Sequence, residues 1–288
     1  MNTKKSVIFL SGLLFIFLNL SGCTLPSQKG ISGDNTTVDS AKRVTGVRNF
    51  LKEFPVKNSN RVALVIGNGD YETQALFNPI YDAQDMSNTL NKLGFSVIQV
   101  LNADKAMMEK AIQKFGRELY GDIVSLVYYS GHGVQYNGKN YMIPIGAVSA
   151  INNRKPRVLN TDAIGLDSVL SIMENAKNRL NLVVLDACRD NPFSGFKKGE
   201  QKPGLAPIGS AEGMLIAYAT SPNKAALTST KRNSPYTKHL LHFMKNSVLP
   251  IELMLKQVRV AVKKETDGKQ TPWYSASIEG NFTFVDKH

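Results

Sequence analysis

The chain has 288 residues, of which 42% are hydrophobic and 20% charged, with a formal net charge of +12. This composition is that of a globular protein and excludes both a disordered chain and a protein with many membrane spans. The length suffices for one large domain or two small ones with a sizeable core. The basic residues are spread along the chain without a dense run interleaved with aromatics. We therefore expect no nucleic-acid partner, and attribute the charge to membrane proximity or to no specific role.

The amino-terminal segment predicts an export signal. Lys4 and Lys5 precede an apolar run over residues 7–20, which is short for a membrane-spanning helix. A buried core helix is the alternative, but polar chain without helical periodicity follows the run. Residues 20–23 (Leu-Ser-Gly-Cys) resemble the bacterial lipobox. That resemblance implies a lipid on Cys23, which would anchor the chain to a membrane of the bacterial cell envelope with its remainder outside the cytoplasm.

The chain then divides into three expected parts: a signal peptide at residues 1–22, a lipid-anchored tether at 23–60 and a folded domain at 61–288. Residues 24–45 are rich in Ser, Thr, Gly and Asn, as is typical of a flexible tether. Residues 44–54 are expected to form a short helix.

Beyond residue 60, apolar runs alternate with amphipathic segments. Residues 61–67 are almost continuously apolar, which is typical of a strand buried on both faces. Shorter runs predict further strands at residues 95–101, 122–129, 180–185 and 214–218. Apolar residues at helical spacing predict helices within residues 83–93, 108–119, 166–173, 236–245 and 251–264.

This alternation predicts an α/β fold with a mostly parallel central sheet and helices on both of its faces. Gly94 is expected to end the first helix. Asn137 and Gly138 stand between two apolar segments, a pattern that predicts a β-hairpin.

Two expected strand ends carry candidate catalytic side chains. Residues 129–133 (Tyr-Ser-Gly-His-Gly) follow the third strand, and residues 186–190 (Asp-Ala-Cys-Arg-Asp) follow the fourth. Ligands bind beyond the carboxyl ends of parallel strands, and two right-handed crossovers would bring these ends side by side. The glycines on either side of His132 are expected to place it on an exposed turn.

Cys188 and His132 form the candidate catalytic pair. If Cys23 carries lipid, Cys188 has no partner for an internal disulfide, because the chain has two Cys. Its place at a strand end favours a reactive thiol over a buried, inert one. A neighbouring imidazole lowers the pKa of a thiol and can protonate the leaving amine. The backbone amides of Gly133 and Cys188 are the expected oxyanion donors.

These residues resemble a known family. Residues 130–133 (Ser-Gly-His-Gly) and 186–189 (Asp-Ala-Cys-Arg) resemble the superfamily of caspases, metacaspases and bacterial orthocaspases. The spacing of His132 and Cys188 agrees with the separation of about 50 residues in caspases. The resemblance, which implies a caspase-like fold, runs from about Arg61 to Phe284. Its other matching segments are residues 63–68, 141–144, 233–237 and 270–273.

The chain departs from Asp-specific caspases beside Cys188, with Asp186 in place of Gln and Asp190 in place of Gly. The resemblance to metacaspases and orthocaspases implies that Asp186 and Asp82 form the S1 pocket, which holds the substrate residue P1 before the scissile bond. Two carboxylates suit a cation, so it implies cleavage after Arg or Lys. Two alternatives stay open: Asp82 as an acid favoured by a helix dipole, and Asp186 as a structural acid.

The resemblance also divides the folded domain into a part like the large caspase subunit at 61–193, a linker at 194–207 and a part like the small subunit at 208–288. The linker is rich in Gly, Pro and Lys and is either a self-processing site or an ordinary exposed loop. Its candidate cleavage residues are Lys197, Lys198 and Lys202.

The favoured function is a membrane-anchored cysteine endopeptidase acting on polypeptides with Arg or Lys at P1. A scaffold or binding lipoprotein without turnover is the alternative, although both candidate catalytic residues are present. A transpeptidase of the same nucleophile class would differ only in its acceptor. The sequence shows no metal cluster with ligand spacing and no phosphate-binding loop, and no cofactor is required. Activation by Ca²⁺ is implied by the resemblance to metacaspases.

The lipid anchor can be tested with Cys23→Ser. This change is expected to release the protein from membranes or to leave an unprocessed precursor, because the thiol that accepts the lipid is lost. Membrane fractionation and the mass of the intact protein measure the effect. Cys188→Ser removes the other thiol and should fractionate like the wild type. Unchanged fractionation and mass for Cys23→Ser would contradict the anchor.

Overall fold

The computed structural model describes residues 46, 48–57, 59–154, 158–188, 205–209, 211–222, 224 and 226–285. All of them belong to one compact unit, Ser40–His288. The expected signal peptide, Cys23 and the candidate cleavage residues Lys197, Lys198 and Lys202 lie outside the described residues.

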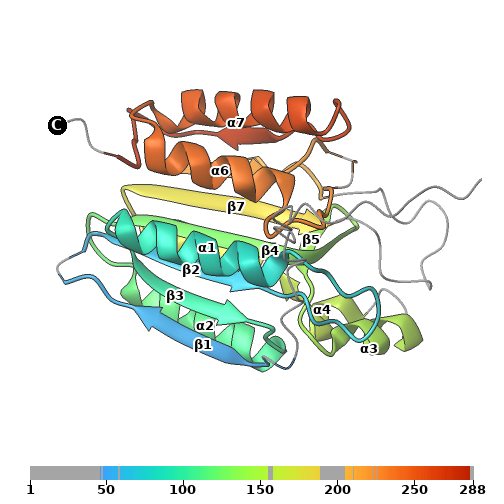
Figure 1. The fold of residues 1–288 in the computed structure, drawn as a ribbon. Coiled ribbons are helices and arrows are strands. Elements are labelled where there is room, and N and C mark those ends of the chain that lie inside the picture. Colours follow the sequence, from blue (N-terminus) through green and yellow to red (C-terminus); the bar gives the residue numbers. More distant parts are fainter. Residues whose placement is uncertain are drawn as a thin grey trace, which may run out of the picture. The chain divides into compact units, whose positions relative to one another are not determined.

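The strands of the described part form one nine-stranded sheet, with the order β1-β3-β2-β4-β7-β8-β9 along its main path and β5 and β6 attached beside β4 (Figure 1). The five inner strands of that path are parallel, and the two edge strands are antiparallel. The bounds are β1 Phe50–Phe54, β2 Arg61–Gly67, β3 Ser96–Leu101, β4 Val124–Tyr136, β5 Lys139–Met142, β6 Ile164–Gly165, β7 Leu180–Cys188, β8 Met214–Tyr218 and β9 Trp273–Ala276.

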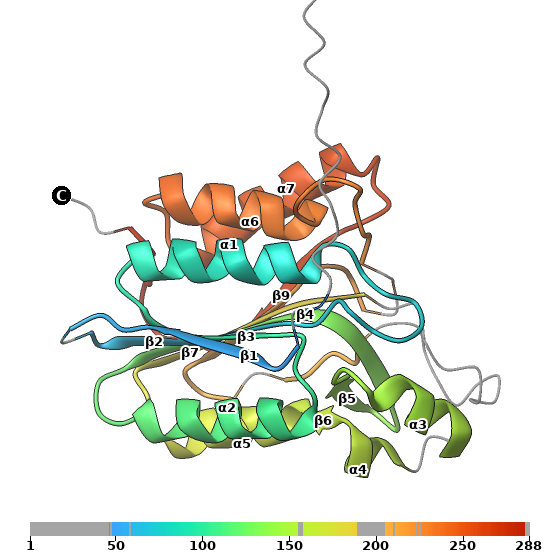
Figure 2. The same cartoon turned by 60° about the horizontal axis from the view of Figure 1, so that its bottom comes forward.

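Helices cover both faces of this sheet, which confirms the predicted α/β fold (Figure 2). Helices α1, α6 and α7 pack on one face, α2 and α5 pack on the other, and α3 and α4 lie with β5 and β6 at one end. None of the described helices is long and apolar enough to cross a membrane. The bounds are α1 Pro79–Lys92, α2 Lys105–Glu118, α3 Ala147–Arg154, α4 Leu159–Asp162, α5 Leu166–Asn175, α6 Pro235–Asn246 and α7 Ile251–Glu265.

Strand β2 shows why its sequence is almost continuously apolar after Arg61. Ala63 and Val65 pack in the cluster under α1, α6 and α7, whereas Leu64 and Ile66 pack in the cluster under α2 and α5. Successive side chains of a strand point to opposite faces, so a strand between two helical layers needs apolar residues at every position.

Two helix ends follow local signals in the sequence. Pro79 stands in the first turn of α1, where its missing N–H costs nothing, and Gly94 follows the helix with a φ of +84°. Ser234 caps α6 by accepting a hydrogen bond from the amide of Thr237 at 3.0 Å. The amino ends of α1 and α6 become important below, because they meet at the candidate site.

The expected helix over residues 44–54 is wrong where the structure describes it. Phe50–Phe54 is strand β1, paired antiparallel with β3. Leu51 packs against one hydrophobic cluster and Phe54 against the other, which is a period of two rather than a helical period. Pairing with the open edge of β3 thus decides the conformation of this short segment.

The third strand also extends further than expected. Instead of ending near residue 129, β4 continues to Tyr136 and turns at Asn137 and Gly138 into β5, as the predicted hairpin requires. His132 therefore lies within a strand and is 1% exposed, so the predicted exposed turn is wrong. The continuation pairs with β7 as far as His132 and with β5 from Gly133 to Tyr136, and this pairing compensates for its glycines and polar residues.

Candidate active site

The two candidate catalytic residues lie on neighbouring strands. β4 pairs with β7 in parallel, and the register sets the backbone of His132 opposite that of Cys188. The same register sets Ser130 opposite Asp186. The two expected strand ends thus lie side by side, beyond the end of β2 at Gly67.

Two tyrosines hold the backbone of His132 from both sides. The His132 amide donates to Tyr71 Oη at 3.0 Å, and Tyr129 Oη donates to the His132 carbonyl at 2.6 Å. The Tyr71 ring also packs on the imidazole, with ring centroids 4.4 Å apart. Tyr71 Oη in turn donates to the carbonyl of Ile143 at 3.0 Å, which links the support to the strand hairpin. The imidazole is therefore held by buried aromatic groups in a fixed position.

The carbonyl oxygen of Gln74 lies 2.8 Å from Nε2 of His132. A carbonyl can only accept, so Nε2 is the protonated nitrogen of the neutral ring and Nδ1 keeps the lone pair that a base needs. Gln74 has a φ of 54°, a backbone region that is uncommon for residues other than glycine. The sequence did not reveal this partner, because a main-chain carbonyl leaves no residue-type signal.

The environment of Gly133 fits an oxyanion donor. Ile143 N donates to His132 O at 3.1 Å, and hydrogen-bonded pairs alternate with non-bonded pairs in an antiparallel ladder. The next pair, Gly133 and Met142, is therefore non-bonded, and the Gly133 N–H points away from β5. A Cβ at Gly133 would lie 2.9 Å from the Cβ of Ala187, so only glycine fits at this position.

The two candidate S1 acids meet at Ser234. Asp82, in the first turn of α1, accepts from the Ser234 amide at 3.1 Å through Oδ1. Asp186 Oδ2 accepts from the Ser234 hydroxyl and from Thr237 Oγ1, the latter at 2.7 Å. Asp82 is 0% exposed and Asp186 is 3% exposed. Three separate segments of the chain thus bring two carboxyl groups together in the interior.

The ionisation of this pair is costly. Burial raises the pKa of Asp82 well above its ordinary value, and the charge of Asp186 raises it further. Burial also raises the pKa of Asp186, against the effect of the hydrogen bonds from Ser234 and Thr237. Two like charges out of water disfavour the doubly ionised form of the pair, and a cation placed between them would favour it.

Sequence reasoning did not assign roles to Tyr71, Gln74, Ser234 or Thr237. Residues 233–237 were among the segments that carry the family resemblance, but their bonds to the acids depend on how α6 docks against α1 and β7. Among the described residues, no group of three or more His, Cys, Asp or Glu side chains is placed to hold a metal ion. Activation by Ca²⁺ therefore stays a prediction.

Comparison with known proteins matches the part of the chain that was expected to form the folded domain. A family model described as the caspase domain matches residues 60–283. The human mucosa-associated lymphoid tissue lymphoma translocation protein 1 is 30% identical over 234 residues, which are 79% of this chain and 27% of that protein. Its mouse homologue is 30% identical over 131 residues, 45% of this chain and 15% of that protein. The chain thus matches only a minor part of these relatives' length.

A solved structure shows the same fold. Caspase-1 from Spodoptera frugiperda superposes with a TM-score of 0.58 at 18% sequence identity, covering 80% of this chain and 91% of that one.

The contribution of Tyr71 to holding His132 can be measured through the free energy of unfolding. Tyr71→Phe is expected to lower the free energy of unfolding by about 1–3 kcal/mol, because the buried His132 N–H loses its acceptor. Tyr141→Phe is the matched control: its hydroxyl donates one bond to Asn160 at 2.7 Å, and its removal is expected to cost less, about 0.5–1.5 kcal/mol. Urea unfolding measures both changes. Equal losses in the two variants would contradict the role of Tyr71.

Proposed function

Because the chain belongs to the caspase-domain family of peptidases, we propose that it is a cysteine endopeptidase with Cys188 as nucleophile and His132 as general base. The observation that carries this proposal is the register of β4 and β7, which sets the two residues opposite each other on adjacent strands. The orientation of His132 by the Gln74 carbonyl supports it, because that bond leaves Nδ1 as the basic nitrogen.

The reaction is acyl transfer to the thiol. His132 takes the proton of Cys188, the thiolate attacks the carbonyl carbon of the scissile bond, and negative charge passes to the carbonyl oxygen. His132 gives its proton to the amine as the C–N bond breaks, which leaves a thioester. Water then attacks the thioester and loses a proton to His132. The C–S bond breaks, the acid product leaves, and His132 returns its proton to the thiolate. The amides of Gly133 and Cys188 would stabilise the oxyanion in both steps.

The substrate preference proposed is Arg or Lys at P1. The buried Asp82 and Asp186 carboxylates supply two acceptors to one cation, and a planar guanidinium matches such acceptors with paired hydrogen bonds. The hydroxyls of Ser234 and Thr237 and the amide of Ser234 hold one oxygen of each acid in place. A substrate Asp would add a third negative charge to the same site.

The remaining parts of the proposal rest on the sequence. Cys23 carries the lipid that anchors the chain to a bacterial envelope membrane, and the tether leads to a domain that acts outside the cytoplasm. Lys197, Lys198 and Lys202 are the proposed points of self-processing. Their basic side chains agree with the proposed P1 preference, so one specificity would serve both substrate and linker.

The catalytic pair can be tested by substitution. Cys188→Ala and His132→Ala are each expected to abolish cleavage of an Arg-containing peptide, and the double variant should lose no more, because the residues act as a unit. His242→Ala, on the exposed side of α6, is the control and should retain wild-type turnover. Wild-type turnover in Cys188→Ala would show that the nucleophile is another group. Thermal unfolding of each variant checks that activity is lost without loss of the fold.

The specificity can be tested with fluorogenic peptides that differ only at P1. Arg or Lys is expected to exceed Asp by at least about two orders of magnitude in kcat/KM, because charged hydrogen bonds contribute about 1.5–3 kcal/mol each. Asp186→Asn should lower this ratio while leaving alkylation of Cys188 largely intact. Asp167→Asn, which changes an exposed acid on α5, should leave the ratio unchanged. Indifference to P1 charge in the wild type would remove both acids from the S1 assignment.

A further inference from the structure

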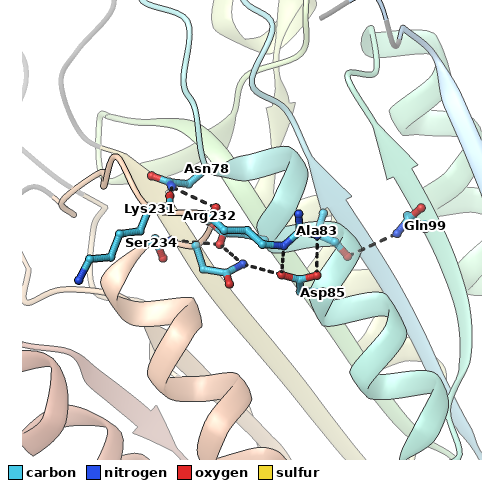
Figure 3. Close-up of polar contacts among 9 residues, drawn as sticks. Asn78, Ala83, Asp85, Gln99, Lys231, Arg232 and Ser234 are labelled. Carbon is cyan, nitrogen blue, oxygen red and sulfur yellow. Dashed lines mark hydrogen bonds and ion pairs between the residues drawn. The ribbon is translucent and has the colours of Figure 1, made fainter. Parts of the chain in front are cut away.

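A third acid lies one turn along α1 from Asp82. Asp85 accepts two hydrogen bonds from Arg232, from Nε to Oδ2 and from Nη2 to Oδ1, each 2.8 Å long (Figure 3). The guanidinium also lies over the ring of Tyr81, 4.6 Å from its centroid. This paired geometry is the one that a carboxylate offers to a substrate arginine.

Asn233 connects this ion pair to the candidate S1 acids. Its side-chain nitrogen donates to Asp82 Oδ1 at 3.1 Å and to Asp85 Oδ2 at 3.0 Å. Two carboxylates therefore flank a single amide nitrogen, and Arg232 is the residue immediately before it. The pKa of Arg232 is raised chiefly by its hydrogen bonds to Asp85 and also by the negative charge of Asp82. The chain thus holds one of its own guanidinium groups at the edge of a site proposed to bind that group.

The backbone around Arg232 is fixed while its side chain is accessible. Asn78 donates to the carbonyl oxygens of Lys231 and Arg232 at 2.7 and 3.2 Å (Figure 3). It also accepts from the Ser229 amide at 2.8 Å. The Arg232 side chain, however, is 49% exposed and its Asp85 partner is 25% exposed. Exposed ion pairs are weak, so the direction of this side chain depends on which carboxylates it can reach.

We propose that Asp85 sequesters Arg232, so that the chain's own guanidinium stays out of the Asp82–Asp186 pair and leaves it to the arginine of a substrate. Asp85 is then a specificity-determining residue that touches no substrate. Without its charge, Arg232 would turn to the nearest remaining acid, Asp82, and compete with P1. This inference rests on the proposed S1 role of the two acids.

The test is a double-variant cycle on the full chain with peptides carrying Arg or its neutral analogue citrulline at P1. Asp85→Asn is expected to raise KM for the Arg peptide by about tenfold or more, with kcat within about threefold, because an internal cation competes for the site. Arg232→Gln alone should behave like the wild type. Combined with Asp85→Asn, it should restore KM to within about threefold of the Arg232→Gln value.

Rescue separates sequestration from a structural role. If Asp85 only supported the fold, removal of Arg232 would not restore KM, and equal impairment of the single and double variants would overturn the proposal. Asp122→Asn breaks a different surface contact, that with Arg179 at 3.6 Å, and should change neither peptide's KM. Asp85→Ser replaces Asp85→Asn if thermal unfolding shows that the latter does not fold.

A binding arm keeps this test independent of turnover. Agmatine, which carries the guanidinium of arginine, is titrated into the Cys188→Ala chain with and without the Asp85 and Arg232 changes. Weaker binding by about tenfold in Asp85→Asn and recovery in the double variant support sequestration. If the wild-type chain binds agmatine but does not prefer Arg peptides, the proposed function fails and the cycle still decides the role of Asp85. If agmatine does not bind, both the S1 assignment and this inference are wrong.

Discussion

The parallel pairing of β4 with β7 is the constraint on which the rest of the site depends. It runs from Val124 to His132 on one strand and from Leu180 to Cys188 on the other. One register sets His132 opposite Cys188 and Ser130 opposite Asp186, so the candidate catalytic pair and one candidate S1 acid share one ladder. A slip by one residue would turn every side chain of a strand to the other face and would separate His132 from its place opposite Cys188.

Around this ladder, support comes from segments distant in sequence. Tyr71 and Gln74 reach His132 from the segment before α1, and Ser234 reaches both acids from the amino end of α6. The hydroxyl of Tyr128 donates to Thr237, whose hydroxyl donates to Asp186. The buried carboxylate of Asp186 is therefore the last acceptor in a chain of hydrogen bonds. Asn78 and Asn233 then join α1 to the loop before α6. The positions of the candidate site residues at this end of the sheet therefore depend on how helices α1 and α6 pack against it.

Much of the fold could be predicted because burial leaves a pattern in the sequence. The strand at Arg61–Gly67 is apolar after its first residue, the strand at Met214–Tyr218 is apolar throughout, and both are as predicted. The extension of β4 could not be predicted, because Ser130, Gly131 and His132 carry no strand signal and are held by their neighbours. Gln74 acts through its main chain, and Ser234 acts through the position of α6, so neither role depends on a recognisable side-chain pattern. The motif around Cys188 indicated the chemistry, whereas the contacts of Gln74 and Ser234 depend on the tertiary structure.

Because Asp82 and Asp186 meet at Ser234 out of water, the protonation of this pair is linked to the stability of the fold and to the binding of the proposed cation. A carboxyl whose pKa is raised by folding stabilises the fold while it holds its proton, and this contribution is lost as the pH rises through the raised pKa. Ionisation of the pair therefore lowers the stability of the folded chain over the same pH range in which the pair gains the charge that would attract a cation. A positively charged ligand at this position would offset the repulsion between the two ionised carboxylates. A cation bound as proposed would therefore gain affinity as the pH rises, while the stability of the unliganded domain would fall.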